Sequence, residues 1–158
     1  MHFLCPNHRQ RLVEMPEKEI SNYWLEWMNY AGLYYELNQW ADSIAFVGCA
    51  FDLTSCALFR RNINRGSMVT HVALSTIYLA NTMCHQHDTA KANQVLSLSV
   101  QRLGLMMLHD PTEAWIEECL DILTDAHKHR AFFEEYLNLP FNEQFQPDPL
   151  PLQASQLH

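Results

Sequence analysis

Two consecutive helical stretches decide the fold, and they occupy residues 23–50, which read YWLEWMNYAGLYYELNQWADSIAFVGCA. Apolar side chains recur there at spacings of three and four, as between Tyr23, Trp27 and Tyr30. Such spacing places them on one face of an α-helix, whereas the period-two alternation of a strand does not extend over a useful length. A polar pair at 38–39 interrupts the pattern, so we predict two helices joined by a short turn.

The same periodicity continues on both sides of this pair and predicts five helices in all. Pro16 suits a first helical position, and Asp88 and Asp110 are suitable caps for two later helices. The predicted spans are 16–37, 40–60, 67–84, 88–109 and 110–137. Because short turns between long helices make antiparallel hairpins, we expect an all-α fold of five antiparallel helices, with two hairpins and a C-terminal capping helix.

The chain has the size of one domain, with 158 residues of which 48% are hydrophobic. A chain of this length buries a sizeable core, and its composition excludes wholesale disorder. We expect an N-terminal arm over residues 1–15 and a helical repeat-like domain over 16–138. Prolines then break the periodicity, which predicts a proline-rich, flexible tail over 139–158.

The net charge of −8 is distributed unevenly along the chain. Residues 1–109 carry 8 acidic and 8 basic side chains, whereas residues 110–158 carry 10 acidic and 2 basic ones. This balance argues against nucleic-acid binding through bulk charge. Arg60, Arg61 and Arg65 form a local basic corner at the turn after the second predicted helix.

The sequence predicts a cytoplasmic protein without a membrane span. The charge-free run 66–87 contains too many polar residues for a lipid-exposed helix. The N-terminus has no apolar run of the length that a signal peptide needs. Four of the five cysteines lie in predicted helices, which fits reduced thiols better than a disulfide framework.

The first two predicted helices resemble a tetratricopeptide repeat. Eight residues fall where that family places its packing residues: Trp27, Ala31, Tyr34, Leu37, Trp40, Ser43, Val47 and Ala50. A weaker second copy is offset by 49 positions, from Ser43 to Ala92, whereas the family repeats about every 34 residues. Over about residues 23–99, the chain is therefore similar to the tetratricopeptide-like α–α superhelical class. This resemblance implies protein or peptide binding, and it transfers no ligand-contacting residue.

We therefore expect a non-catalytic, bacterial-type adaptor or chaperone-like module that binds a protein or peptide partner. On the first helix, Trp24 and Tyr35 should point away from the main aromatic stripe and leave aromatic surface exposed. The partner-binding candidates are Trp24, Trp27, Tyr34, Tyr35, Arg60, Arg61 and Arg65. The sequence contains no Gly-x-Ser-x-Gly or His-Glu-x-x-His motif, and we predict no catalytic residue.

A second hypothesis is a regulatory zinc-binding protein. Cys5 and His8 have a Cys-x-x-His spacing, and Cys84 and His87 lie together at the end of the third predicted helix. These four side chains would complete a tetrahedral zinc site if the N-terminal arm lay over that turn.

A third hypothesis is a homo-oligomeric regulatory or structural protein, such as a homodimer. The acidic last helix or the proline-rich tail would then dock on the basic corner of a second copy. Such charge-driven pairing weakens as the salt concentration rises.

Overall fold

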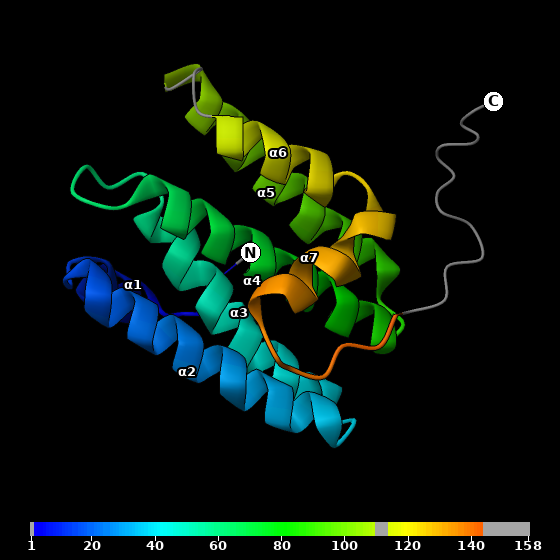
Figure 1. The fold of residues 1–158 in the computed structure, drawn as a ribbon. Coiled ribbons are helices and arrows are strands. Elements are labelled where there is room, and N and C mark those ends of the chain that lie inside the picture. The colour runs from blue at the N-terminus through cyan, green and yellow to red at the C-terminus, as the bar shows by residue number, and fades with distance from the viewer. Residues whose placement is uncertain (1, 110–113, 144–158) are drawn as a thin grey trace.

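A computed structural model describes residues 2–109 and 114–143 and confirms an all-helical fold (Figure 1). These ranges contain seven α-helices, one 3₁₀ helix and no strand. The elements are α1 (Pro6–Val13), α2 (Glu17–Glu36), α3 (Trp40–Ala57), α4 (Arg65–His85), α5 (Thr89–His109), α6 (Ala114–Leu123), η1 (Ala126–Lys128) and α7 (His129–Tyr136).

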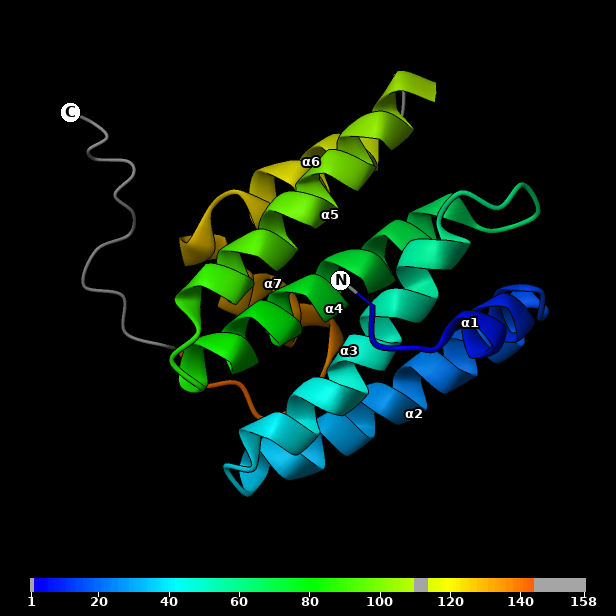
Figure 2. The ribbon, with the colours of Figure 1, turned by 180° about the vertical axis from the view of Figure 1, so that it is seen from behind.

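Helices α2 to α5 each pack on the next helix along the chain and form two consecutive antiparallel hairpins (Figures 1 and 2). Their ends differ from the predicted ones by three residues at most. Helix α4 lies in the middle, in contact with α2, α3, α5, α6 and α7. This position explains why α4 is charge-free from residue 66 onward, because a helix that is covered on most sides cannot solvate charges.

The N-terminal segment, predicted as an arm, contains α1 and is attached to α3 (Figure 2). The buried carboxylate of Asp52 accepts hydrogen bonds from the backbone N–H groups of Phe3 (2.5 Å) and Leu4 (2.8 Å). The Phe3 ring lies against Gly48, where an added Cβ would be 2.4 Å from the ring. These contacts join residues far apart in sequence, so local periodicity does not predict them.

The last helix, predicted over 110–137, is divided into α6, η1 and α7. The side chain of Asp125 accepts a hydrogen bond from the N–H of His127 and caps η1, which begins a new helical direction. As a result, α7 contacts α4 as well as α6 (Figure 1). The predicted start at Asp110 lies outside the described residues.

The turns of the two hairpins are built alike, 49 positions apart. Asn38 follows α2 with φ 58°, and His87 follows α4 with φ 64°. In each turn the next N–H donates back to the helix, from Gln39 to Tyr34 O and from Asp88 to Met83 O, both at 2.9 Å. This is the Schellman arrangement that ends a helix. The 49 positions between the two turns equal the predicted offset between the two repeat copies.

Replacing His87 with glycine should raise the free energy of unfolding by about 1 kcal/mol, because a left-handed backbone costs about this much for a residue with a Cβ. Urea unfolding followed by circular dichroism measures the change. Asn38→Gly is the matched control and should gain less, because asparagine tolerates this conformation. A loss of stability in His87→Gly would contradict the prediction.

Candidate functional site

A segment without regular secondary structure follows α7 over residues 137–143, bends at Leu139 and crosses the face formed by α2 and α4 (Figure 1). We call this segment the strap. It approaches α2 closely at Gly32, where an added Cβ would lie 3.0 Å from Leu139 Cδ2. Residues 139–143 therefore pack on the helical body, although the sequence predicted the start of a flexible tail there. The rest of that predicted tail lies outside the described residues.

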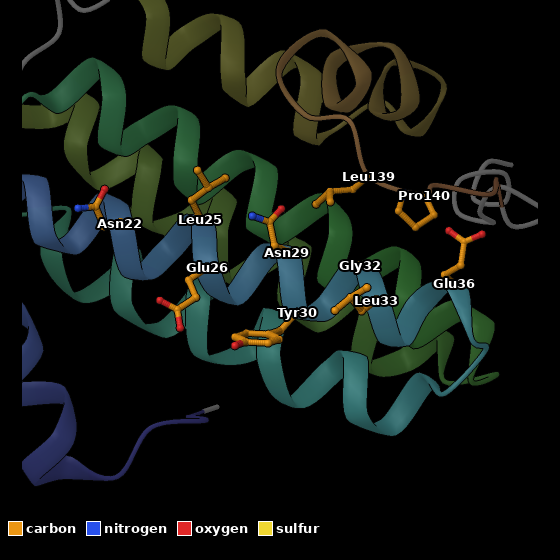
Figure 3. A pocket seen from close by; sticks show the side chains of 10 residues that line it. All are labelled: Asn22, Leu25, Glu26, Asn29, Tyr30, Gly32, Leu33, Glu36, Leu139 and Pro140. Carbon is orange, nitrogen blue, oxygen red and sulfur yellow. The ribbon is translucent and has the colours of Figure 1, made fainter.

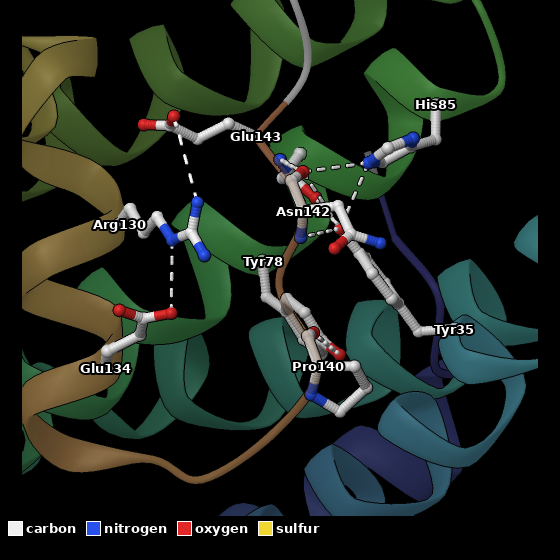
Figure 4. A network of polar contacts seen from close by, with 9 residues as sticks. Tyr35, Tyr78, His85, Arg130, Glu134, Pro140, Asn142 and Glu143 are labelled. Carbon is white, nitrogen blue, oxygen red and sulfur yellow. Dashed lines mark hydrogen bonds and ion pairs between the residues drawn. The ribbon is translucent and has the colours of Figure 1, made fainter.

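Side chains of α2 and α4 hold the strap by its main chain (Figure 4). Tyr78 Oη donates a hydrogen bond to the carbonyl oxygen of Pro140 (2.7 Å). The N–H of Asn142 donates to Tyr35 Oη (2.9 Å), and Asn81 Nδ2 donates to the Asn142 carbonyl oxygen (3.1 Å). Because these bonds reach main-chain atoms, they do not depend on which side chains the strap carries.

His85 completes this set of groups. Its Nε2 lies 3.0 Å from the Asn142 carbonyl oxygen and 3.0 Å from Tyr35 Oη, and its ring stacks on Trp40. Burial raises the pKa of Tyr35 to about 12 and also raises the pKa of Tyr78. Both phenols therefore stay protonated at ordinary pH. We call the four side chains the main-chain clamp: Tyr35, Tyr78, Asn81 and His85.

Phe141 is the strap's buried side chain, and it joins an aromatic cluster. Its ring centroid lies 4.8 Å from that of Phe133, which lies 4.6 Å from that of Tyr78. Burying Phe141 contributes about 1.5–3 kcal/mol, and each clamp hydrogen bond contributes about 1 kcal/mol. Ordering residues 139–143 costs about 1–2 kcal/mol per residue. The contacts and the ordering cost are therefore opposing contributions of similar size.

A groove of about 600 Å³ lies beside the strap along α2 (Figure 3). Leu25 and Leu33 line it and are 45% and 62% exposed, and Leu139 of the strap forms part of its wall. Among the described residues that line it, the charged ones are Glu26 and Glu36. The groove therefore combines exposed apolar surface with negative charge.

A second groove, of about 580 Å³, lies between α2, α4, α6 and α7. Leu25 lines both grooves, so they adjoin each other. Trp24, His71 and Trp115 contribute rings to the second groove. The Trp24 and His71 rings stack at 4.0 Å, and burial lowers the pKa of His71 to about 4. This imidazole is therefore neutral at neutral pH.

Trp24 and Tyr35 are buried, contrary to the expectation that they leave aromatic surface exposed. Their exposed fractions are 4% and 1%. The reason is that α4 covers this side of α2: Trp24 Nε1 donates to Ser75 Oγ (2.6 Å), and Tyr35 bonds to Asn81. Tyr35 nevertheless belongs to the clamp, and Trp24 lines the second groove.

The other two predicted aromatic residues lie elsewhere on α2. Tyr34 stacks on Phe46 of α3, and Trp27 packs against Tyr23; both are half-buried. Tyr23 and Tyr30 are the aromatic side chains of α2 that are exposed, and Tyr30 lines the groove along α2. The expected exposure is therefore wrong for Trp24 and Tyr35, whereas Trp27 and Tyr34 stay predicted candidates for partner binding.

The basic corner lies at the opposite end of α4 from the clamp. Arg65 begins α4 and His85 ends it, so they are about 30 Å apart along the helix. Arg60 donates to the Met15 carbonyl oxygen (2.7 Å), and Arg61 is exposed. The three arginines thus take no part in holding the strap.

The structure does not bring the four predicted zinc ligands together. In residues 2–109 and 114–143, no three His, Cys, Asp or Glu side chains form a group that could hold a metal ion. Cys5 caps α1 by accepting the N–H of His8, whereas Cys84 lies in the last turn of α4. His87 provides the left-handed residue of the turn that follows.

The described residues thus form an all-helical body whose main-chain clamp holds residues 137–143 of the same chain, beside a groove with exposed apolar side chains. Comparison of the chain with protein-family models, curated proteins and solved structures finds no match. The resemblance to tetratricopeptide repeats therefore remains a prediction. Throughout the described ranges, no helix combines the length and apolar character needed to cross a membrane.

Proposed function

We propose that this protein is a non-catalytic module that binds a segment of another protein in the groove along α2. The observation that carries this proposal is the exposure of Leu25 and Leu33 inside a concave surface. Large apolar side chains gathered in a groove are typical of sites that bind protein segments. The resemblance to tetratricopeptide repeats favours the same function, as an adaptor or chaperone-like protein of the cytoplasm.

The charge of the groove indicates which segments it prefers. Glu26 and Glu36 lie along it, and no lysine or arginine of the described residues does. A partner segment that combines apolar residues with lysine or arginine would complement this surface. An acidic segment would be repelled. The groove is therefore selective although its apolar contacts are not directional.

Leu33→Glu should weaken peptide binding at least tenfold, because it adds a third carboxylate and removes an apolar contact. Selecting 12-residue peptides from a displayed random library on the immobilised full chain supplies the ligands, and fluorescence polarisation measures their affinity. The selected sequences should be enriched in apolar and basic residues.

Leu105→Glu is the matched control, because Leu105 is 52% exposed on α5, a helix that does not line the groove. It should leave the affinity unchanged. If selection enriches no peptides, or if both variants bind them equally well, the proposed function is wrong.

A further inference from the structure

The geometry points to the main-chain clamp as a binding site for an extended segment of the partner protein, which replaces the strap. This inference rests on the proposed function, since the same partner would lie in the groove along α2. The strap then represents the kind of ligand that the clamp accepts. The clamp binds the strap until a partner segment takes its place.

The clamp binds main-chain atoms. Its bonds reach the carbonyl oxygen of Pro140 and both the N–H and the carbonyl oxygen of Asn142. Any extended segment presents the same groups at the same spacing. A helical segment does not, because its own backbone hydrogen bonds engage them. The ligand is therefore extended where it meets the clamp.

The clamp is continuous with the groove along α2. Leu139 and Pro140 of the strap form one wall of the groove along α2. A partner segment seated against Leu25 and Leu33 thus reaches the strap directly. It makes the groove contacts in addition to those of the clamp, which allows it to compete with a tethered segment of high effective concentration.

The end of the strap makes only one ion pair with the helical body among the described residues. Glu143 approaches Arg130 at 3.9 Å, and both side chains are exposed. Exposed ion pairs contribute little to stability. Arg130 also pairs with Glu134 at 3.1 Å and keeps that partner when the strap leaves. What the partner must replace is chiefly the main-chain bonds and the ring of Phe141.

The partner's chemistry follows from these contacts. It is an extended segment that presents an aromatic side chain in the position of Phe141, where the rings of Tyr78 and Phe133 pack. Apolar residues with lysine or arginine precede it along the groove, near Glu26 and Glu36.

A disulfide that locks the strap tests the inference. An added Cβ at Gly32 lies 3.7 Å from Leu139 Cβ, within the range of disulfide bonds. The variant Gly32→Cys with Leu139→Cys is therefore locked when oxidised and free when reduced. The probe is a fluorescein-labelled peptide with the sequence of residues 137–143, LNLPFNE, and polarisation measures its binding to the full chain.

We expect the reduced variant to bind the probe at least tenfold more tightly than the oxidised variant. Leu139→Cys alone is the control for the native cysteines and should show no dependence on oxidation. Adding Asn81→Ala to the reduced double variant should weaken probe binding at least fivefold. Circular dichroism checks that each variant keeps its helices.

Equal binding by the two forms, or no binding by the reduced form, would overturn the inference. A dimer of the reduced form in light scattering would also overturn it, because the occupant would then be the strap of a second copy. Peptides that depend on Leu33 but bind the locked and free forms equally would leave the proposed function intact. Failure to select such peptides would instead count against the proposed function.

Discussion

Replacing Phe133 with alanine should lower the free energy of unfolding by about 3–5 kcal/mol, the usual cost of emptying a fully buried aromatic site. Phe133 is completely inaccessible to solvent. Its ring lies between Tyr78 of α4 and Phe141 of the strap, at centroid distances of 4.6 and 4.8 Å. The cavity would open where α4, α7 and the strap meet, so the loss should affect all three.

Urea unfolding at neutral pH measures this loss. Tyr136→Ala is the matched control, because Tyr136 lies on the same helix but is 45% exposed. It should cost less than about 1 kcal/mol. In Phe133→Ala, amide hydrogen exchange of Asn142 should also accelerate, since the strap loses the ring on which Phe141 rests. Equal losses in the two variants would show that α7 is not anchored through Phe133.

The four long helices of the hairpins were predictable because the signals that define them are local. Apolar spacing, a polar pair at 38–39 and a cap at Asp88 determine helices α2 to α5 within a few residues. The divided last helix and the docked N-terminal segment were not predictable in this way. The N-terminal segment is held by Asp52 through Phe3 and Leu4, and the last helix divides where α7 turns to pack on α4; both sets of contacts join residues that are distant in sequence.

The strap shows the same limit at the candidate site. Pro140 correctly indicates that the helix has ended, but a proline after a helix is equally compatible with a free tail and with a docked segment. The close approach at Gly32 and the burial of Phe141 distinguish a docked segment from a free tail, and both depend on tertiary contacts. Composition therefore predicted the conformation of these residues but not their attachment.

One feature of the clamp is visible in the sequence. Tyr78, Asn81 and His85 are spaced by three and four residues, so they share one face of α4. Polar side chains on one face of a nearly charge-free helix indicate that this face meets polar groups. Their partners are main-chain atoms of the strap, and no side-chain pattern in the strap could identify them.

The position of the acidic residues also matters for the proposed function. The net charge of −8 arises entirely from residues 110–158. Glu26 and Glu36, which line the groove, belong instead to the neutral part of the chain. The local charge of the groove along α2 is thus independent of the excess charge that dominates the composition.

Acidification from neutral pH to pH 4 should destabilise the protein by about 3 kcal/mol through His71 alone. The imidazole stacks on Trp24 at 4.0 Å, and its Nδ1 is buried without a hydrogen-bond partner among the described residues. Burial therefore disfavours the charged form and lowers the pKa of His71 to about 4. The carboxylate of Glu17 acts in the opposite direction but has the smaller effect.

The direction of this change in stability follows from proton binding by His71 in the folded and unfolded states. In the unfolded chain the pKa of His71 is about 6.5, so below this pH the unfolded state binds a proton that the folded state rejects. The stabilising contribution of neutral His71 is therefore fully present above pH 6.5. It decreases as the pH falls toward about 4, the pKa of His71 in the folded state. Burial also lowers the pKa of His129, which adds to the loss in the same direction.

Urea unfolding of the wild-type chain and of His71→Gln, measured at half-unit steps between pH 7.5 and pH 4, separates the contribution of His71 from those of other groups. Because glutamine does not titrate, the stability of the variant should fall by about 3 kcal/mol less than that of the wild type over this range. Carboxylates and His129 titrate in both proteins and cancel in the comparison. If the stabilities of the two proteins change in parallel with pH, His71 accepts a proton in the folded protein without a penalty. The description of His71 as a buried, neutral imidazole against Trp24 would then be wrong.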